Sequence, residues 1–418
     1  MAAETVIIEK LGAKGDGVAQ TPEGPVFVPF ALPGERLTIA RQKSSGALLA
    51  LMEASAERVE PACRHFGPDG KNGTCGGCSL QHLAPAPYQD FKRQVVIDAL
   101  AAHGLDCPVE PLVGAAPGQR RRATFSARKT EAGIVLGFSS PESHHIVEIE
   151  ECPVLSPALF ARLPALRLLA GILASGSDPF RIAVLETETG LDISFSGLKP
   201  PSEKRRQAAT RAVIAVKGIA RLTYEDEIIV EPVRPALDIA GTTVNPPPSG
   251  FAQATREAEE AMAGLVAKHL KSAKHVADLF SGFGTFALRL AEKSKVHAVE
   301  FDAKALAALD MAVRNRQGLK TVTSERRDLF RRPLLARELS GFDGAVFDPP
   351  RAGAREQAEE LARSKVAKIA AVSCNPATLG RDLRLLVDGG YRIERVIPID
   401  QFLWSHHVEA VALLSRTK

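Results

Sequence analysis

The sequence predicts a multidomain α/β protein with an N-terminal OB-like β-barrel, an α+β central domain and a C-terminal Rossmann-like domain. Three observations predict this fold class. Short strand-like runs separated by glycine and proline occupy residues 1–56, as in a small barrel. The run Pro246–Pro248, closely followed by Gly250, cannot continue a helix or a central strand and marks a domain boundary. From Phe251 onward, helical and strand-like segments alternate, which predicts a doubly wound parallel sheet.

Composition narrows the class of protein. The chain has 418 residues, which fits two or three domains. Its 45% hydrophobic and 24% charged residues exclude wholesale disorder. The formal net charge is only +4, so any nucleic-acid surface must be a local patch. No apolar run approaches ~18 uncharged residues and the start lacks a basic and apolar leader, so we expect a cytoplasmic protein that does not enter a membrane.

An ordered set of turns and strands supports the barrel over residues 1–56. The segments Gly15–Ala19, Val26–Pro29 and Leu32–Glu35 follow one another between the strand-like runs Val6–Ile8 and Arg36–Ile39. This pattern resembles a TRAM domain, an OB-like barrel that contacts RNA. Another small β-barrel is the alternative.

Two interleaved units are expected beyond the barrel. Residues 57–82 and 115–248 are assigned to the central domain, and residues 83–114 and 249–418 to the C-terminal domain, because a helix expected at 88–100 can pack there despite its early position. In the central domain we expect helices at about 158–174 and at 201–216, and strands at Ile134–Phe138, Ile182–Glu186, Leu191–Phe195 and Ile228–Val230. In the C-terminal domain we expect strands at His275–Phe280, Val296–Glu300, Gly344–Asp348, Lys368–Ser373 and Arg392–Ile399.

A glycine-rich turn at Gly282 and Gly284 predicts a nucleotide-binding loop. It follows a strand and opens a helix, where glycine permits a tight turn and a close ligand. Glu300 ends the next strand, where a carboxylate can accept hydrogen bonds from ribose hydroxyls. NAD(P) enzymes and S-adenosylmethionine (SAM) methyltransferases share these features. The run Asp348-Pro349-Pro350 at a later strand end favours a methyltransferase.

Two further residues suggest covalent catalysis. Cys374 ends a strand within the polar run Ser-Cys-Asn-Pro, and Glu409 precedes an apolar strand. A thiolate that adds to C6 of uracil activates C5 toward a methyl donor, and a base must then remove the C5 proton. The adjacent His406 and His407 point to opposite faces of a strand and are interpreted as structural or RNA-contacting residues.

The motifs together resemble the RNA uracil-C5 methyltransferases, and within them the RumA-type 23S rRNA enzymes that carry a TRAM domain. The resemblance rests on residues 278–284, 348–353, 373–376, 400–402 and 407–409, in that order. It implies that Cys374 is the nucleophile and Glu409 the base. The SAM site implied by the resemblance and the glycine loop comprises Gln253, Phe280, Gly282, Gly284, Thr285, Glu300, Asp328 and Asp348. Thr285 and Thr255 depart from the family, which has asparagine at the first position and often at the second.

Four of the six cysteines are expected to enclose a metal or a cluster. Cys75 and Cys78 are close in sequence, Cys63 lies upstream and Cys152 is distant. Zinc is one possible occupant. The spacing also resembles the 4Fe–4S site of the same family, which implies a 4Fe–4S cluster in the central domain. Cys107 has no partner in either interpretation.

A basic strand is the expected RNA-binding element. Residues 119–129 contain five cations and no acid, and alternate residues of a strand share one face. The candidate RNA-binding residues are Arg120, Arg121, Arg122, Arg128 and Lys129. The resemblance favours 23S rRNA as the partner, because the TRAM domain and the cluster accompany the rRNA enzymes. A tRNA substrate is the alternative, and a non-catalytic Fe–S protein that binds RNA is a further one.

Overall fold

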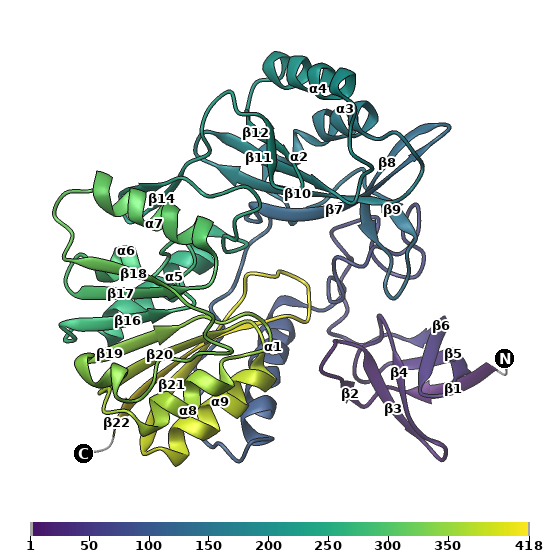
Figure 1. The fold of residues 1–418 in the computed structure, drawn as a ribbon. Helices are drawn as coiled ribbons and strands as arrows, with labels where there is room; N and C mark the ends of the chain where they lie inside the picture. The colour runs from purple at the N-terminus through teal and green to yellow at the C-terminus, as the bar shows by residue number, and fades with distance from the viewer. Residues whose placement is uncertain (1–2, 417–418) are drawn as a thin grey trace.

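The computed structural model describes residues 3–416 and contains three units (Figure 1). The N-terminal unit is a six-stranded sheet curled around its own core, in the order β1-β5-β6-β4-β3-β2. A backbone hydrogen bond from Glu9 N to Val18 O joins the first segment to β3 and closes the curl. The strands are β1 (Ala3–Ile7), β2 (Lys10–Leu11), β3 (Gly17–Thr21), β4 (Gly24–Val28), β5 (Arg36–Gln42) and β6 (Ser45–Glu53). This agrees with the predicted barrel, whose residues 1–2 lie outside the described part of the chain.

The central unit is a seven-stranded sheet in the order β13-β12-β11-β10-β7-β8-β9, packed against helices (Figure 1). Its strands are β7 (Arg122–Thr130), β8 (Gly133–Ser139), β9 (Ile146–Glu148), β10 (Phe180–Thr187), β11 (Gly190–Ser196), β12 (Ile219–Tyr224) and β13 (Glu227–Val230), and its helices are α2 (Pro157–Phe160), α3 (Leu163–Leu173) and α4 (Glu203–Ala215). The single helix expected over 158–174 is wrong. Pro164 fits only the first turn of a helix, so α3 starts anew at Leu163.

The C-terminal unit has a seven-stranded sheet in the order β18-β17-β16-β19-β20-β22-β21. The strands are β16 (His275–Leu279), β17 (Lys295–Glu300), β18 (Val322–Arg326), β19 (Gly344–Phe347), β20 (Lys368–Ser373), β21 (Tyr391–Ile399) and β22 (Glu409–Arg416). The predicted parallel pairing is present from β16 to β20, whereas β22, whose direction was not predicted, runs antiparallel to both β20 and β21. The connection 400–408 contains no crossover helix, and a short connection of this kind joins antiparallel strands.

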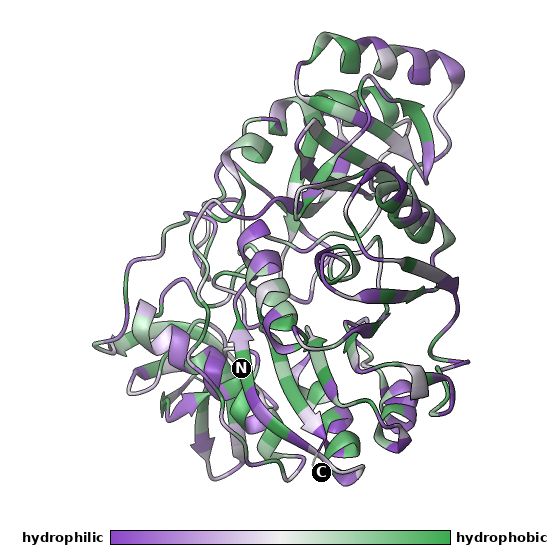
Figure 2. Ribbon diagram, turned by 90° about the vertical axis from the view of Figure 1, so that its left-hand side faces the viewer, coloured by the Kyte–Doolittle hydropathy of each residue, from purple (hydrophilic) through white to green (hydrophobic). Residues whose placement is uncertain are grey.

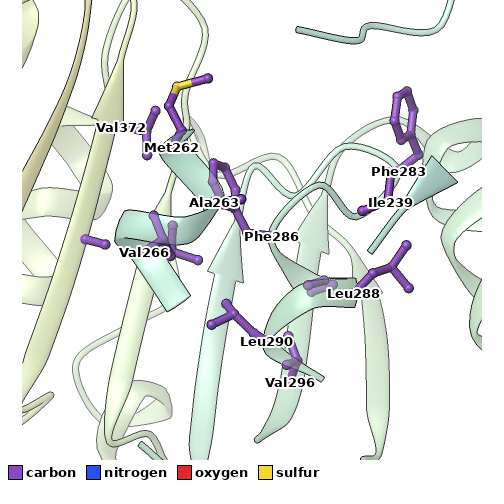
Figure 3. Packing of buried hydrophobic residues seen from close by; sticks show 14 of the residues in the cluster. Ile239, Met262, Ala263, Val266, Phe283, Phe286, Leu288, Leu290, Val296 and Val372 are labelled. Carbon is purple, nitrogen blue, oxygen red and sulfur yellow. The ribbon is translucent and has the colours of Figure 1, made fainter. Parts of the chain in front are cut away.

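Helices cover both faces of this sheet. They are α5 (Arg256–His269), α6 (Ala287–Leu290), α7 (Ala303–Asn315), α8 (Arg355–Arg363) and α9 (Pro376–Asp388), with a 3-10 turn at Glu338–Gly341. Side chains alternate between two cores, so Val276 packs with α5 and α6 while its neighbour Ala277 packs with α8 and α9. Figure 3 shows Met262 and Val266 of α5 beside Val372 of β20 in the first core. In Figure 2 several strands of this unit are coloured largely green, the colour of hydrophobic residues.

Helix α1 (Pro85–Ala101) packs on the C-terminal unit. Val96 and Leu100 lie in the same buried core as Leu383 of α9. The segment that follows α1 runs along β21, with hydrogen bonds from Glu110 N to Val396 O and from Val113 N to Pro398 O. An early stretch of the chain therefore completes the edge of a sheet formed from its last residues.

A hairpin before the proline run also packs on the C-terminal unit. It consists of β14 (Leu237–Ile239) and β15 (Thr242–Val244), and Leu237, Ile239 and Val244 are buried with the residues of α5. The C-terminal unit therefore begins before the boundary expected at residue 249. The hairpin is too short to give a sequence signal of its own.

A small apolar cluster fixes the barrel against the C-terminal unit. Leu32 of the barrel, Leu80 and Leu83 of the cysteine-bearing segment, Tyr88 of α1 and Leu403 are buried together. Among the described residues, no helix has the length and apolar character that crossing a lipid bilayer requires.

Candidate active site

A cavity of about 720 Å³ opens at the carboxyl ends of β16, β17, β19 and β20. From β16 the chain proceeds to β17 on one side, whereas β19 lies on the other, so this is the switch point where open α/β sheets bind ligands. Both predicted catalytic residues and most of the predicted cofactor residues line the cavity: Gln253, Phe280, Gly282, Thr285, Glu300, Asp328, Asp348, Cys374 and Glu409.

The glycine loop is held in a left-handed conformation at three positions. Phe280 has φ 61°, Gly282 φ 54° and Gly284 φ 100°. A Cβ at Gly282 would meet no atom within 4 Å, whereas a Cβ at Gly284 would lie 2.5 Å from Leu309 Cδ1. Gly284 does not line the cavity. Its role as a cofactor contact stays a prediction, and the structure shows that this glycine allows the loop to pack closely on Leu309 of α7.

The Glu300 carboxylate is fixed by backbone donors. Its Oε2 accepts from Gly282 N at 3.0 Å, and its Oε1 accepts from Phe301 N at 2.7 Å and Asp302 N at 2.8 Å. The carboxylate thereby ties the glycine loop to the end of β17. It also keeps an acceptor at the wall of the cavity.

The two positions that depart from the family differ in their surroundings. Thr255 is buried at the N-terminus of α5, where its hydroxyl accepts a hydrogen bond from Ala258 N at 3.2 Å. It caps the helix and does not line the cavity. Thr285 does line the cavity.

Aromatic rings border the cavity near Asp328. The rings of Phe280 and Phe330 lie 5.4 Å apart, and Phe330 N donates to Asp328 Oδ1 at 3.0 Å. Phe301 and Phe330 are both exposed. Sequence reasoning missed these two phenylalanines, because isolated aromatic residues outside a motif give no specific signal.

Cys374 and Glu409 lie at adjoining strand ends. Ser373 of β20 pairs with Ala410 of β22 across the antiparallel ladder, so Cys374 and Glu409 occupy the next opposed positions. Glu409 is buried, whereas Cys374 is partly exposed. The antiparallel insertion of β22 is what brings the carboxylate beside the thiol.

Low solvent access disfavours the charged forms of these groups. Burial raises the pKa of Glu409 to about 8, and the nearby Asp348 adds to the rise. Burial raises the pKa of Cys374 to about 11, with Glu409 and Asp348 contributing. The cavity therefore favours neutral acids until a cation or a hydrogen-bond donor changes the balance.

Comparisons with known proteins identify the family. Residues 213–417 match the tRNA (uracil-5-)-methyltransferase model, and residues 3–44 match the TRAM domain. The 23S rRNA (uracil(1939)-C(5))-methyltransferase RlmD of Halomonas elongata is 33% identical over 441 residues, which cover 98% of this chain and 89% of that protein. The chain belongs to the RNA uracil-C5 methyltransferase family. It is a SAM-dependent enzyme of RNA modification with an N-terminal TRAM domain.

Further relatives agree with this family. An uncharacterized RNA methyltransferase of Agrobacterium fabrum is 58% identical over 416 residues, covering 100% of both chains. The Pyrococcus abyssi tRNA (uracil-54, C5)-methyltransferase, solved with S-adenosyl-L-homocysteine, has a TM-score of 0.76 and 23% sequence identity. The similarity covers 98% of this chain and 99% of that one, so the two proteins share one fold over nearly their whole length.

A series of buried hydrogen bonds links the carboxylates of Asp348 and Glu409 in the methyltransferase. Gln253 Nε2 donates to Asp348 Oδ2 at 3.0 Å, Gln401 Nε2 donates to Gln253 Oε1 at 2.9 Å, and the same Gln401 nitrogen donates to Glu409 Oε1 at 2.6 Å. The sequence assigned no role to Gln401. Only the folded structure shows that this residue of the 400–408 connection reaches both strands.

A second cavity of about 460 Å³ meets the first at Cys374 and Arg351, which line both. Lys14 of the TRAM domain, Phe91 of α1 and His407 contribute to its walls. Three segments that are distant in sequence thus surround one side of the thiol. Burial, with a smaller contribution from His406, lowers the pKa of His407 to about 4, so the imidazole is neutral near pH 7.

The basic strand divides into two faces. Arg122 and Arg128 point away from the core, and Arg122 lies 4.1 Å from the ring centroid of Phe251. Arg121 is buried, and its Nη2 donates to Glu259 Oε2 at 2.6 Å. The prediction of Arg121 as an RNA contact is therefore wrong, because its charge is neutralised between the central domain and α5.

The remaining cations of this strand have protein contacts. Arg120 lies 5.7 Å from the ring centroid of Phe402. Lys129 Nζ donates to Ala174 O at 3.3 Å. Arg120 and Arg122 also line the cavity that the cysteines surround.

Cys63, Cys75, Cys78 and Cys152 all line one cavity of about 280 Å³ in the central domain. Burial raises the pKa of Cys78 to about 12, which the hydrogen bond from the Gln81 side chain partly offsets. Within residues 3–416, no group of three or more His, Cys, Asp or Glu side chains is arranged to hold a metal ion. The four cysteines therefore share a cavity but do not converge on a single point that would hold one metal ion. Cys107 lies apart, packed against the buried core that includes residues of α1 and α9.

Proposed function

We propose that this methyltransferase converts one uridine of 23S rRNA to 5-methyluridine, with Cys374 as nucleophile and Glu409 as base. The observation that carries the proposal is the pairing of these two residues at adjoining ends of β20 and β22, inside one cavity. Methylation of a nitrogen or a ribose hydroxyl needs no such pair. Methylation of uracil C5 needs both a nucleophile and a base.

The proposed chemistry has two stages. The Cys374 thiolate adds to C6 of the uracil, and C5, now enolate-like, takes the methyl group. SAM supplies that methyl group when bound and leaves as S-adenosylhomocysteine. The Glu409 carboxylate then accepts the proton from C5, the S–C6 bond breaks, and the double bond re-forms.

The SAM site is proposed to comprise the cavity residues Gln253, Phe280, Gly282, Thr285, Glu300, Asp328 and Asp348. The Glu300 acceptor at the cavity wall suits the ribose hydroxyls. We further propose that the uridine approaches Cys374 through the second cavity, which lies on the other side of the thiol. A base inside a helix cannot expose C5 and C6, so the target must be looped out or flipped.

Arg120, Arg122, Arg128 and Lys129 remain the proposed RNA contacts of the central domain. Arg128 supports this because it is exposed on the outward face of β7. Removing a charge contact of this kind should reduce the salt dependence of RNA binding. Substituting Arg128 with Met should therefore weaken binding to RNA at moderate salt without altering SAM binding.

A 4Fe–4S cluster is proposed for the cavity of the central domain, held by Cys63, Cys75, Cys78 and Cys152. The four cysteines line one cavity and supply the ligand number of such a cluster, and zinc with four cysteines is the alternative. Four cysteine ligands leave no open iron position, so the cluster is assigned a structural or RNA-contacting role. It enters no step of the methyl transfer.

Metal analysis tests the cluster. Protein purified without oxygen should be brown and contain about four irons per chain. Cys78→Ser should lose iron, and Cys107→Ser should retain it, because Cys107 lies outside the cavity. Stoichiometric zinc in a colourless protein would contradict the assignment.

Trapping with 5-fluorouridine tests the mechanism. Fluorine at C5 cannot leave as a proton, so RNA carrying this base should remain covalently bound to the enzyme after methyl transfer. The adduct survives denaturing electrophoresis, and Cys374→Ala should abolish it. Glu409→Gln should accumulate the corresponding adduct on ordinary uridine RNA, and rapid turnover by that variant would exclude Glu409 as the base.

The 23S rRNA is favoured over tRNA by the relative from Halomonas elongata, whose name specifies that substrate. The tRNA enzyme of Pyrococcus abyssi shares the fold, and its name makes tRNA the second candidate. Labelled SAM incubated with the enzyme and each unmodified RNA separates the two. Mapping 5-methyluridine in RNA from a deletion strain then identifies the position.

A further inference from the structure

Gln401 occupies a buried position between the cofactor wall and the catalytic carboxylate. The residue is 2% exposed, and its side chain makes three hydrogen bonds. Its Nε2 donates to Glu409 Oε1 at 2.6 Å and to Gln253 Oε1 at 2.9 Å. Its Oε1 accepts from Ala254 N at 2.8 Å.

These partners determine the orientation of the amide. Rotating the Gln401 amide by half a turn would place its NH₂ group against the Ala254 N–H and its oxygen against two acceptors. Both N–H groups and the oxygen are therefore committed in the observed orientation. A fully committed buried amide is a rigid element, since each alternative leaves donors or acceptors unpaired.

The segment that carries Gln253 and Ala254 is itself held in place. Arg121 Nε donates to Gln253 O at 3.2 Å, and Arg121 N donates to Ala254 O at 2.9 Å. Arg121 is fixed in turn by its buried ion pair with Glu259. Gln401 thus connects Glu409 to a backbone that does not move freely.

We propose that Gln401 is a positioning residue for the proton-abstraction step. It holds Glu409 through Oε1, which leaves Oε2 for the C5 proton, and its donated hydrogen bond favours the carboxylate form that must act as base. The same nitrogen holds Gln253, which donates to Asp348, so one amide is linked to both carboxylates of the cavity, Glu409 and Asp348. The proposal rests on Glu409 being the base.

Charged and titratable groups from three elements face Glu409. Asp348 after β19 disfavours its ionisation, and Arg122 of β7 favours it. Cys374 after β20 shares the cavity and ionises less readily when Glu409 is charged. The Gln401 hydrogen bond affects the ionisation of Glu409 separately from these charges, because the amide is neutral and acts at contact distance.

The test substitutes Gln401 with Met, which retains the length of the side chain and removes its donor and acceptor. The variant and the unsubstituted enzyme react with ordinary uridine RNA and SAM over pH 6 to about 10, and denaturing electrophoresis measures the covalent adduct. We expect Q401M to form the adduct but release it slowly. The pH at which release becomes fast should rise by about one to two units, and release at neutral pH should fall by about 10-fold or more.

Gln357→Met is the matched control. Gln357 is also a buried glutamine with a committed amide, but its partners are the N–H and C=O of Leu334, away from both cavities. We expect this variant to lose thermal stability without any change in the pH of adduct release. Near-UV circular dichroism checks that Q401M is folded.

The outcomes separate this proposal from the proposed function. If Q401M releases product with the pH dependence of the unsubstituted enzyme, Gln401 is structural and the inference is wrong. The same holds if Gln357→Met shifts the pH of release equally. If the unsubstituted enzyme forms no adduct with 5-fluorouridine RNA, the proposed mechanism fails and this inference fails with it.

Discussion

Lys92 Nζ lies 2.6 Å from Asp400 Oδ1, and both side chains are almost completely buried. Asp400 Oδ2 also accepts from the Tyr88 hydroxyl at 2.6 Å, so two residues of α1 share one carboxylate. This contact joins α1 to the connection that carries Gln401. Without the Lys92 ammonium group, the buried Asp400 carboxylate would lack its ion-pair partner.

Removing one member of this pair should strongly destabilise the C-terminal unit. Lys92→Met leaves the Asp400 carboxylate buried without its cation, and such losses cost about 3 to 5 kcal/mol. Thermal unfolding should show a large decrease in Tm. Arg355→Met is the control, because its ion pair with Glu359 is exposed and should contribute no more than about 0.5 kcal/mol.

The two glycines of the loop should respond differently to alanine. Gly282→Ala adds a methyl group in open space and incurs only the cost of a left-handed backbone, about 1 kcal/mol. Gly284→Ala incurs the same cost and also forces its Cβ against Leu309 Cδ1, which lies 2.5 Å away. We expect Gly284→Ala to have the lower Tm by thermal unfolding. Equal effects would show that packing on α7 is not the reason for Gly284.

Ionisation of Glu409 should make the ligand-free enzyme less stable at alkaline pH. Its pKa is about 8 in the folded protein and near 4.5 when unfolded, so between these values the folded state binds more protons. The favourable contribution is complete below pH 4.5 and is lost as the pH rises toward 8. Glu409→Gln cannot ionise, so its Tm should exceed that of the parent increasingly from pH 5.5 to pH 8.5, equivalent to about 2 to 4 kcal/mol. A difference in Tm that does not vary with pH would contradict this assignment.

Binding of SAM should release protons that S-adenosylhomocysteine does not. The cavity is lined by Asp348, Cys374 and Glu409, all with pKa values raised mainly by burial. A sulfonium cation favours the charged forms of these groups, whereas the thioether of S-adenosylhomocysteine is neutral. Calorimetry near pH 7.5 in phosphate and in Tris, which differ in ionisation enthalpy, measures the protons released. The same number for both ligands would mean that the three acids do not sense the charge.

Much of the catalytic unit could be predicted from the sequence because its signals are local. Buried parallel strands are continuous apolar runs, and the glycine loop and the Asp-Pro-Pro motif sit at their ends. Strand β18 escaped prediction because Val322–Arg326 is a half-exposed edge with few apolar residues. The family motifs also brought Cys374 and Glu409 together before their register was known.

Contacts between distant elements could not be predicted in this way. Periodicity shows which face of a strand is buried, but it does not show what covers that face. Arg121 illustrates the limit: its partner Glu259 lies on a helix of another unit. The role of Gln401 and the antiparallel direction of β22 depend likewise on how the chain returns at residues 400–408.

Helix α1 gives this enzyme an unusual order of assembly. Its residue Lys92 can form its ion pair only after Asp400, 308 positions later, has been synthesised. The segment that follows α1 can form its hydrogen bonds only after β21 has been synthesised. On the ribosome, the apolar face of α1 therefore emerges long before its binding site exists. The TRAM barrel and the central sheet can form earlier, but the nucleophile, the base and the wall of the second cavity come together only when the last strand is made. A nascent chain thus carries its TRAM domain before it gains any capacity to modify RNA.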